Sequence, residues 1–527
     1  MSLSTKTRTR VARAAFVALL MSGAATAALA APARDAKLQE MQRQLDEMRA
    51  QMAQMRAANA GDARLSAIQA QLDSFSAELS ELKAQQATAK SEIATLKTPS
   101  GSAVTTKLSN GKPTFATADG NFTANLKAIV MFDAASYMQK DNLGAAVVGR
   151  DLNDGTNFRR ARFGIDGKLF KDFGYSLLYE FGGSGAEDSG RIHEAYFQYT
   201  GLDFATIKLG AMEPNIGLAA ASSTSAIPLM ERPSAAEIAR NVAAGDGRSA
   251  LQIQANTTLG DGDTGLSANL FGATALTGAT VGAAQGFGEQ QAWIGRVALA
   301  PSMANGFQAH LGGNIQYVFH PSDVTGGAAP RYPVQLRDRP ELRVDGTRLI
   351  DTGAIDANHI TVYGGEAAVG FGAFLLEGEY FKFDIDRRQS GAAPLADPDF
   401  DGWYLQGSWV LTGERRKYNG KEARFDGPKP AFNFNPDAGT WGAWEIAARY
   451  STVNLNFREG VAGAATPVGG IRGGEQKIWS AGVNWYLNPT LRMMLDYQHV
   501  DVDRLNGAGV QIGQDYDAVA MRAQLSF

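Results

Sequence analysis

Apolar and polar positions alternate along FRRARFGIDGKLF, residues 158–170. One set of alternate positions is apolar and holds Ala161, Phe163, Ile165 and Leu169. The other set is charged and holds Arg160, Arg162, Asp166 and Lys168. Successive side chains of a β-strand point to opposite faces, so the pattern predicts a strand with one apolar and one charged face. A soluble β-sandwich or a transmembrane β-barrel with its apolar face toward lipid would both produce it.

Similar short segments, separated by Gly, Asp, Asn and Pro, continue to Phe527. We count sixteen strand candidates: 121–138, 157–170, 172–184, 191–200, 204–211, 248–260, 263–274, 290–300, 306–319, 359–370, 372–386, 400–412, 440–455, 476–487, 491–503 and 514–527. Short turns alternate with long connections, notably 212–247, 320–358 and 456–475. Long loops on one rim and short turns on the other are typical of outer-membrane barrels. The exception is 413–439, which is long where a short turn is expected.

The C-terminal strands favour the barrel over the sandwich. In 491–503, the apolar set Leu491, Met493, Leu495 and Tyr497 alternates with Arg492, Asp496 and Gln498. Aromatic residues near strand ends suit interfacial girdles, and a terminal phenylalanine is similar to the insertion signal of bacterial outer-membrane barrels. The predicted fold is therefore all-β, a sixteen-stranded antiparallel transmembrane barrel spanning 121–527.

A helical region precedes the barrel. In residues 36–97, Leu38, Met41, Leu45, Met48, Met52 and Met55 follow a/d heptad spacing, which resumes at Leu65, Ile68, Leu72, Phe75, Leu79 and Leu82. So narrow an apolar stripe needs a partner, so we expect a periplasmic coiled coil of two or three helices. The alternative is a single helix that folds back on another surface. Residues 98–120, rich in Ser, Thr, Gly and Asn, are predicted to be a linker.

The N-terminus predicts export. Residues 1–30 combine a basic start, an apolar stretch and the small-residue end Ala28-Leu29-Ala30, which is the pattern of a secretory signal peptide. Beyond it, no run of about 18 apolar residues provides a membrane-spanning helix.

Composition narrows the functional classes. The chain has no cysteine, which excludes disulfides and thiolate metal sites. Its formal net charge of −4 argues against nucleic-acid binding as a global property. The five histidines lie in no metal-binding spacing and beside no nucleophile motif, so we expect neither an enzyme, nor a metal, nor any other cofactor.

Charged residues recur on the predicted lumen faces. The basic ones are Arg160, Arg162, Lys168, Arg296, Arg449, Arg492 and Arg522. A mixed, solvated wall without selectivity is one interpretation, and a path for anions is the other, because guanidinium groups match phosphate and carboxylate. Loop 320–358 adds a predicted basic vestibule with Arg331, Arg337, Arg339, Arg343 and Arg348.

Five segments resemble the phosphate-selective porin O and P family of Gram-negative outer membranes. They are FRRARFGIDGKLFKDFGY (158–175), IKLGAMEPNIGLAAASSTSAIPLMER (207–232), GWYLQGSWVLTGERRKY (402–418), GAWEIAARYS (442–451) and AGVNWYLNPTLRMMLDY (481–497). The resemblance implies a homotrimeric porin in outer-membrane lipid, whose third loop, 212–247, forms the constriction.

The resemblance also implies site residues. The arginine pair matches Arg159 and Arg160, and the loop-three serine and arginine match Ser223 and Arg232. Together with the basic positions above, the predicted anion path is Arg159, Arg160, Arg162, Ser223, Arg232, Arg339 and Arg343. The chain departs from the family at Ala220, where a lysine is typical, and at His193, where an acid is typical. Small anions are the expected solutes, and phosphate itself is left open.

An envelope protein whose barrel only anchors a coiled-coil stalk is the alternative function. In either case the coiled coil is a candidate for contact with peptidoglycan.

Overall fold

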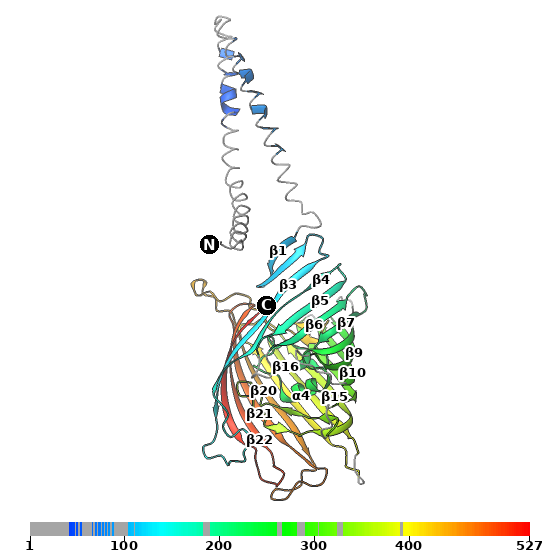
Figure 1. Ribbon diagram of the computed structural model, residues 1–527. Helices are drawn as coiled ribbons and strands as arrows, with labels where there is room; N and C mark the ends of the chain where they lie inside the picture. Colours follow the sequence, from blue (N-terminus) through cyan, green and yellow to red (C-terminus); the bar gives the residue numbers. More distant parts are fainter. Residues whose placement is uncertain are drawn as a thin grey trace, which may run out of the picture. The chain divides into compact units, whose positions relative to one another are not determined.

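The computed structural model describes residues 104–109, 111–182, 190–260, 266–281, 290–303, 305–323, 330–389 and 394–527, with short helical pieces between residues 40 and 88. The chain divides into two compact units, residues 1–101 and 102–527 (Figure 1). The predicted signal peptide and most of the heptad positions lie outside the described residues.

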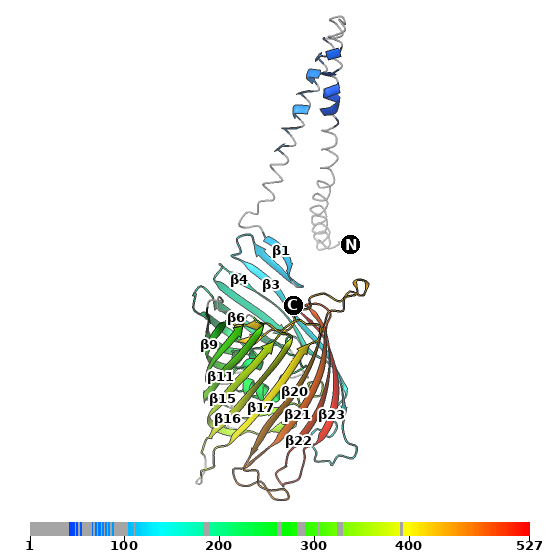
Figure 2. The same cartoon turned by 180° about the vertical axis from the view of Figure 1, so that it is seen from behind.

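The second unit is a closed antiparallel barrel of sixteen strands (Figures 1 and 2). In chain order the strands are β3 (Thr123–Met138), β4 (Gly155–Leu169), β5 (Phe173–Glu180), β6 (Arg191–Tyr199), β7 (Thr206–Met212), β8 (Arg248–Leu259), β9 (Leu266–Thr280), β10 (Gln291–Met303), β11 (Phe307–His320), β15 (Ile355–Phe371), β16 (Phe374–Arg387), β17 (Asp399–Val410), β20 (Ala443–Phe457), β21 (Ile471–Tyr486), β22 (Leu491–Asp503) and β23 (Asp515–Ser526). Closure comes from β23 pairing with β3, where Arg522 faces Asp133. The sixteen predicted strands are confirmed.

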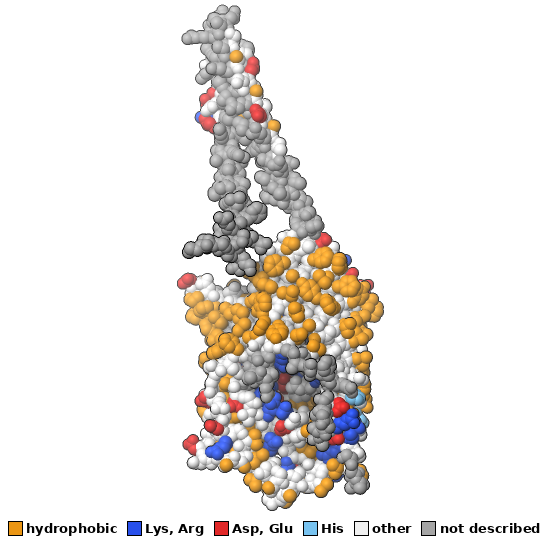
Figure 3. Space-filling model, viewed as in Figure 1, with side chains coloured by type: hydrophobic (Ala, Val, Ile, Leu, Met, Phe, Trp, Pro, Cys, Tyr) orange, Lys and Arg blue, Asp and Glu red, His pale blue; other side chains and the backbone are white. Residues whose placement is uncertain are grey.

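The alternation of faces also holds. Phe163 of β4 and Leu495 of β22 are about half exposed on the outside, whereas Arg162 and Asp496 point inward and are buried. Figure 3 shows hydrophobic side chains gathered over the face formed by β3–β7. In the part of the chain that the structure describes, no helix is long and apolar enough to cross a membrane.

A bulge in β4 explains the arginine pair. Met131 of β3 pairs with Arg160 and Phe132 pairs with Phe158, so Arg159 is the extra residue. In the alternating pattern of this strand, Arg159 falls in the set of positions that is otherwise apolar and faces outward. This predicts a bulge or a rim position, and the bulge is confirmed. It lets two consecutive arginines point into the lumen.

Part of the predicted linker is structured. β1 (Val104–Ser109) and β2 (Lys112–Thr117) form a hairpin that pairs with β3 through Thr114 and Asn125. Its turn contains Gly111 at φ 78°, a conformation that glycine adopts without a steric penalty. This hairpin was not predicted from the sequence because the two strands are short and their alternating pattern cannot be distinguished within a Ser/Thr-rich stretch.

Loop three, residues 213–247, lies inside the barrel. It carries α3 (Leu218–Ala221) and α4 (Ser234–Ala243), and most of its residues are buried. Wall carboxylates hold it by its backbone, since Glu379 of β16 accepts the N–H groups of Leu218 and Ala219 at 2.8 and 2.9 Å. Asp496 of β22 accepts the N–H of Met230 at 2.8 Å.

Two further connections enter the lumen. Loop five, residues 321–354, contains β12 (Pro333–Val334), β13 (Arg337–Asp338) and β14 (Ile350–Asp351). The turn segment, residues 411–442, contains β18 (Tyr418–Asn419), β19 (Arg424–Phe425) and η2 (Pro436–Ala438), and starts from the opposite rim. It meets loop three, because Arg416 donates to the Ala226 carbonyl and Arg424 to that of Ala221.

The first unit is described only at short helical pieces. Among the predicted seam positions, Leu45, Leu72 and Leu79 are buried. Lys83 donates to the Gln42 side chain at 3.0 Å, so two helical segments of one chain approach each other there. This contact favours a helix that folds back within the chain, and it leaves association with a second chain as a prediction.

Candidate solute path

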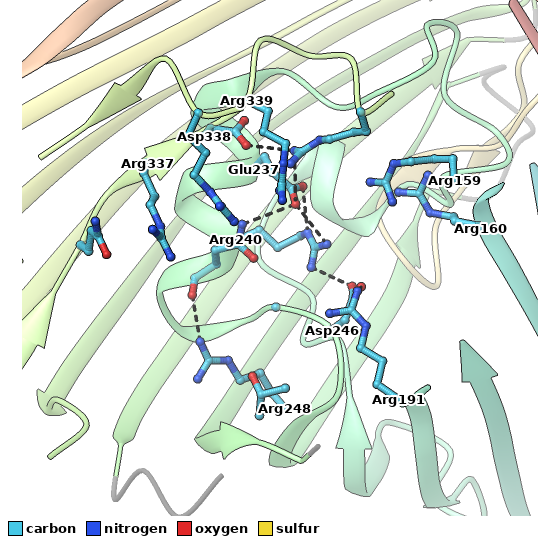
Figure 4. Close-up of a pocket in the computed structure, with 16 residues that line it drawn as sticks. Arg159, Arg160, Arg191, Glu237, Arg240, Asp246, Arg248, Arg337, Asp338 and Arg339 are labelled. Carbon is cyan, nitrogen blue, oxygen red and sulfur yellow. Dashed lines mark hydrogen bonds and ion pairs between the residues drawn. The ribbon is translucent and has the colours of Figure 1, made fainter. Parts of the chain in front are cut away.

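The first cavity, here the outer cavity, lies between loop three, loop five and the wall, and has a volume of about 310 Å³ (Figure 4). Nine arginines line it: Arg159, Arg160, Arg191, Arg240, Arg248, Arg337, Arg339, Arg343 and Arg348. Three carboxylates, Glu237, Asp246 and Asp338, line it as well. The labelled arginines come from both sides of the cavity in Figure 4. The cationic groups that line this cavity therefore outnumber its anionic groups three to one.

Glu231 of loop three holds the arginine pair in place. It accepts from Arg159 at 2.8 and 2.9 Å and from Arg522 at 2.7 Å, and Arg160 lies 3.5 Å away. Burial alone would raise the pKa of Glu231, but the surrounding guanidinium groups, Arg159 first, hold that pKa well below its usual range. The carboxylate is therefore ionised at neutral pH and offsets part of a crowded positive charge.

A second carboxylate of the outer cavity, Asp246, is surrounded by arginines. Asp246 accepts from Arg240 at 2.9 Å and Arg191 at 3.1 Å, and lies 3.5 Å from Arg162. Burial would raise the pKa of Asp246, yet Arg240 and His193 keep that pKa well below its usual range. The group thus stays charged and paired.

His193, Glu213 and Asp246 bring metal-type ligand atoms within 4.8 Å of one another. However, Arg162 lies 2.9 Å from Nε2 of His193, and Arg232 and Arg240 lie 3.5 and 3.4 Å from Glu213. Cations already occupy the surroundings of these ligand atoms, so the arrangement suits an ion-pair network better than a metal site.

The second cavity, here the inner cavity, has a volume of about 310 Å³ and lies between loop three, the turn segment and strands β3–β7. Its charged lining includes Lys127, Glu194, Lys208, Glu213, Glu422 and Arg424. Hydroxyl groups of Ser222, Ser223 and Thr224 line it as well. Along β4, Arg160 lines the outer cavity and Arg162 the inner one, so the inner cavity lies nearer the short-turn rim.

The seven predicted path residues divide between the two cavities. Arg159, Arg160, Arg339 and Arg343 line the outer cavity, and Arg162, Ser223 and Arg232 line the inner one. The guanidinium of Arg232 donates to the backbone carbonyls of Ala219, Ala220 and Ser222, so it also fixes the shape of loop three. Ser223 shares a 2.9 Å hydrogen bond with Ser225.

The expected water-facing wall needs correction. Arg160 and Arg162 point inward as predicted, but they are only 3% and 4% exposed. Arg296, Arg449 and Arg522 are buried by loops that enter the lumen and pair with Glu366, Glu341 and Asp133. Of the five arginines in loop five, four line the outer cavity, whereas Arg331 pairs with Asp323 outside it.

Several lining residues were not predicted. Lys208 lies between the outward-facing residues Ile207 and Leu209, so the alternation of the strand alone could have placed its side chain in the lumen. Arg240 lies on a helix inside a loop, and Arg424 lies in the long connection that stands where a short turn is expected; no strand periodicity marks either position.

The family model described as phosphate-selective porin O and P matches residues 138–527. Porin O of Pseudomonas aeruginosa is 27% identical over 453 residues, covering 82% of this chain and 94% of that protein. An uncharacterized protein of Caulobacter vibrioides is 26% identical over 432 residues, covering 79% of this chain and 78% of that protein.

Solved structures of similar fold include an anion-selective porin from Comamonas acidovorans, with 14% identity, a TM-score of 0.42, and coverage of 77% of this chain and all of that one. The outer-membrane channel DcaP of Acinetobacter baumannii has 13% identity and a TM-score of 0.41, with coverage of 78% and 99%. From the match over residues 138–527 and the sixteen-stranded barrel, the chain belongs to the phosphate-selective porin O and P family and is an outer-membrane porin.

Proposed function

We propose that this porin passes small hydrophilic solutes by diffusion and prefers anions, with phosphate and similar anions as solutes. The observation that carries the proposal is the outer cavity, where nine arginines meet three carboxylates. Arg191 is one-third exposed and Arg337 is exposed, whereas the side chains of Asp338 and Asp246 are no more than 9% exposed. The field at the cavity surface therefore favours anions.

Reversal potentials across planar bilayers test this proposal, with potassium chloride or potassium phosphate at unequal concentrations on the two sides. The potential should report a higher permeability for the anion. Arg337→Gln should lower the ratio of anion to cation permeability. Arg331→Gln is the matched control, because Arg331 lies in the same loop but pairs with Asp323 outside the cavity. Cation preference of the unaltered protein would refute the proposal.

We further propose that the porin is a homotrimer. The apolar face over β3–β7 supports this assembly, since Phe158, Phe163 and Phe197 are all more than half exposed there. The heptad seam of residues 36–97 supports a coiled coil as a second contact between chains, and makes the helical region a candidate for binding peptidoglycan. Cross-linking in detergent tests the assembly, and sedimentation with purified sacculi tests the second contact.

An envelope anchor remains the second candidate, because loops three and five and the turn segment fill much of the lumen. Single-channel conductance distinguishes the two, since a filled barrel would pass no ions.

A further inference from the structure

The inner cavity presents equal numbers of cationic and anionic groups that a solute can reach. Its partly exposed cations are Lys127, Lys208 and Arg424, and its partly exposed carboxylates are Glu194, Glu213 and Glu422. Each of these six side chains is between 15% and 31% exposed. Arg162 and Arg232 also line the cavity but are no more than 5% exposed.

Each of these three cations is already paired with a carboxylate of the wall or of the turn segment. Lys127 lies 2.8 Å from Glu194, and Lys208 lies 3.6 Å from Glu422. Arg424 lies 3.3 Å from Asp426. An inorganic anion in this cavity would have to compete with a fixed carboxylate for each lysine, and it would be repelled by that carboxylate.

The outer cavity has a different balance of charge, although several of its arginines are also paired. Its arginines outnumber its carboxylates three to one, so a simple anion gains attraction there without meeting an equal number of accessible carboxylates. The two cavities therefore offer a solute different balances of charge, an excess of cations in the outer one and near equality among the accessible groups of the inner one.

We propose that the inner cavity binds organic anions that also carry an ammonium group, with acidic amino acids as the simplest members of this class. This inference rests on the proposed function, because the solute must first be accepted by the outer cavity. The ammonium group pairs with Glu194 or Glu422, and the carboxylates of the solute pair with Lys127 or Lys208.

The geometry supports simultaneous pairing. Lys127 and Ser176 both donate to Oε2 of Glu194, and a carboxylate has room for about four hydrogen bonds, so Glu194 retains capacity for a solute donor. A solute with both charges offers a carboxylate to the lysine and an ammonium group to the carboxylate of an existing ion pair, so both partners gain a counter-charge. Chloride or phosphate offers a counter-charge only to the lysine.

Bilayer recordings with the full-length porin test the proposal with two probes, glutamate and glutaramate. Both are five-carbon anions of net charge −1, but glutamate carries an ammonium group and a second carboxylate where glutaramate carries only a neutral amide. We expect glutamate to be more permeant than glutaramate by about threefold, the effect expected of partly exposed ion pairs. A ratio of one or below, in a channel that still prefers anions, would overturn this inference and leave the proposed function standing.

Variants locate the effect. Glu194→Gln and Glu422→Gln should each bring the ratio toward one while raising the permeability of phosphate. Asp437→Asn, at an exposed position of η2, is the control and should keep the threefold ratio. Conductance in potassium chloride shows that each variant has folded and inserted. If both glutamine variants retain the full ratio, the inner cavity is not the site. If the unaltered channel prefers cations, the proposed function fails first.

Discussion

At the scale of single residues, Glu231 balances the charge behind the outer cavity. Its carboxylate touches Arg159, Arg160 and Arg522 and lies 4.0 Å from Arg343. Asp133 is the second carboxylate of this group, at 2.7 Å from Arg522. The guanidinium groups of this cluster outnumber its carboxylates. The cluster is stable because the Glu231 carboxylate lies at its centre and accepts several hydrogen bonds.

Glu231→Gln should destabilise the barrel by about 3–5 kcal/mol, because it leaves buried arginines without their counter-charge. The folded pKa of Glu231 lies below the unfolded value, so its contribution is present above about pH 4 and is lost as the pH falls. The temperature at which the folded form is lost on a detergent gel measures the effect. Asp437→Asn should leave that temperature unchanged.

Asp338 predicts a pH dependence of selectivity. Burial raises the pKa of its carboxyl to about 6, although Arg343 lies only 3.0 Å away. As the pH falls from about 7 to about 5, the carboxyl gains a proton and the outer cavity loses a negative charge. The ratio of anion to cation permeability should therefore rise at low pH. In Asp338→Asn the ratio should be high already at pH 7, and a persisting pH dependence of the same size would assign it to another group.

Only part of the site could be predicted from the sequence. The alternation along β4 predicted that Arg160 and Arg162 point inward and that Arg159 lies near the rim or in a bulge, because strand geometry is local. The partners of these residues, Glu231 and Asp246, come from a loop 70 or more residues away in the chain. No periodicity specifies such pairs, so the burial of the arginines was missed.

At the scale of elements, loop three is held by acceptors on the wall. The carboxylate of Glu379 accepts from two backbone N–H groups at the start of α3 and from Tyr404 at 2.8 Å. Gly402 of β17 lets the wall approach α4, since a Cβ there would come within 3.0 Å of Ala235.

Glu379→Ala should loosen loop three, because α3 loses the acceptor for its first N–H groups. We expect a higher single-channel conductance and a lower anion preference, as the constriction widens. Bilayer recording measures both. Asp399→Asn, on the outer face of β17, should change neither quantity. An unchanged conductance in Glu379→Ala would mean that Asp496 and the other contacts suffice to hold the loop.

The elements themselves were largely predictable, because each barrel strand carries its own alternation and turn residues. The turn segment was not, since its inward path depends on Arg416 pairing with Glu445 and on Arg296 donating to the carbonyls of Glu422 and Ala423. These contacts join residues that are distant in the chain, and only its unexpected length distinguished the segment.

At the scale of the whole molecule, the barrel and the helical region are separate compact units. The channel properties described above all arise from residues 102–527. Deleting residues 36–97 should therefore leave single-channel conductance and reversal potential unchanged, while reducing the yield of cross-linked oligomer if the heptad seam associates between chains. An altered reversal potential would show that the helical region takes part in permeation.

The barrel seam also has a consequence for biogenesis. Arg522 of the last strand contacts Asp133 of the first strand and Glu231 of loop three. The final strand therefore completes its lumenal contacts only with loop three inside, and we expect insertion of the loop and closure of the wall to be coupled. Arg522→Gln should slow the appearance of the compact gel form during refolding into detergent. Refolding at the rate of the unaltered protein would show that the wall closes independently of its contents.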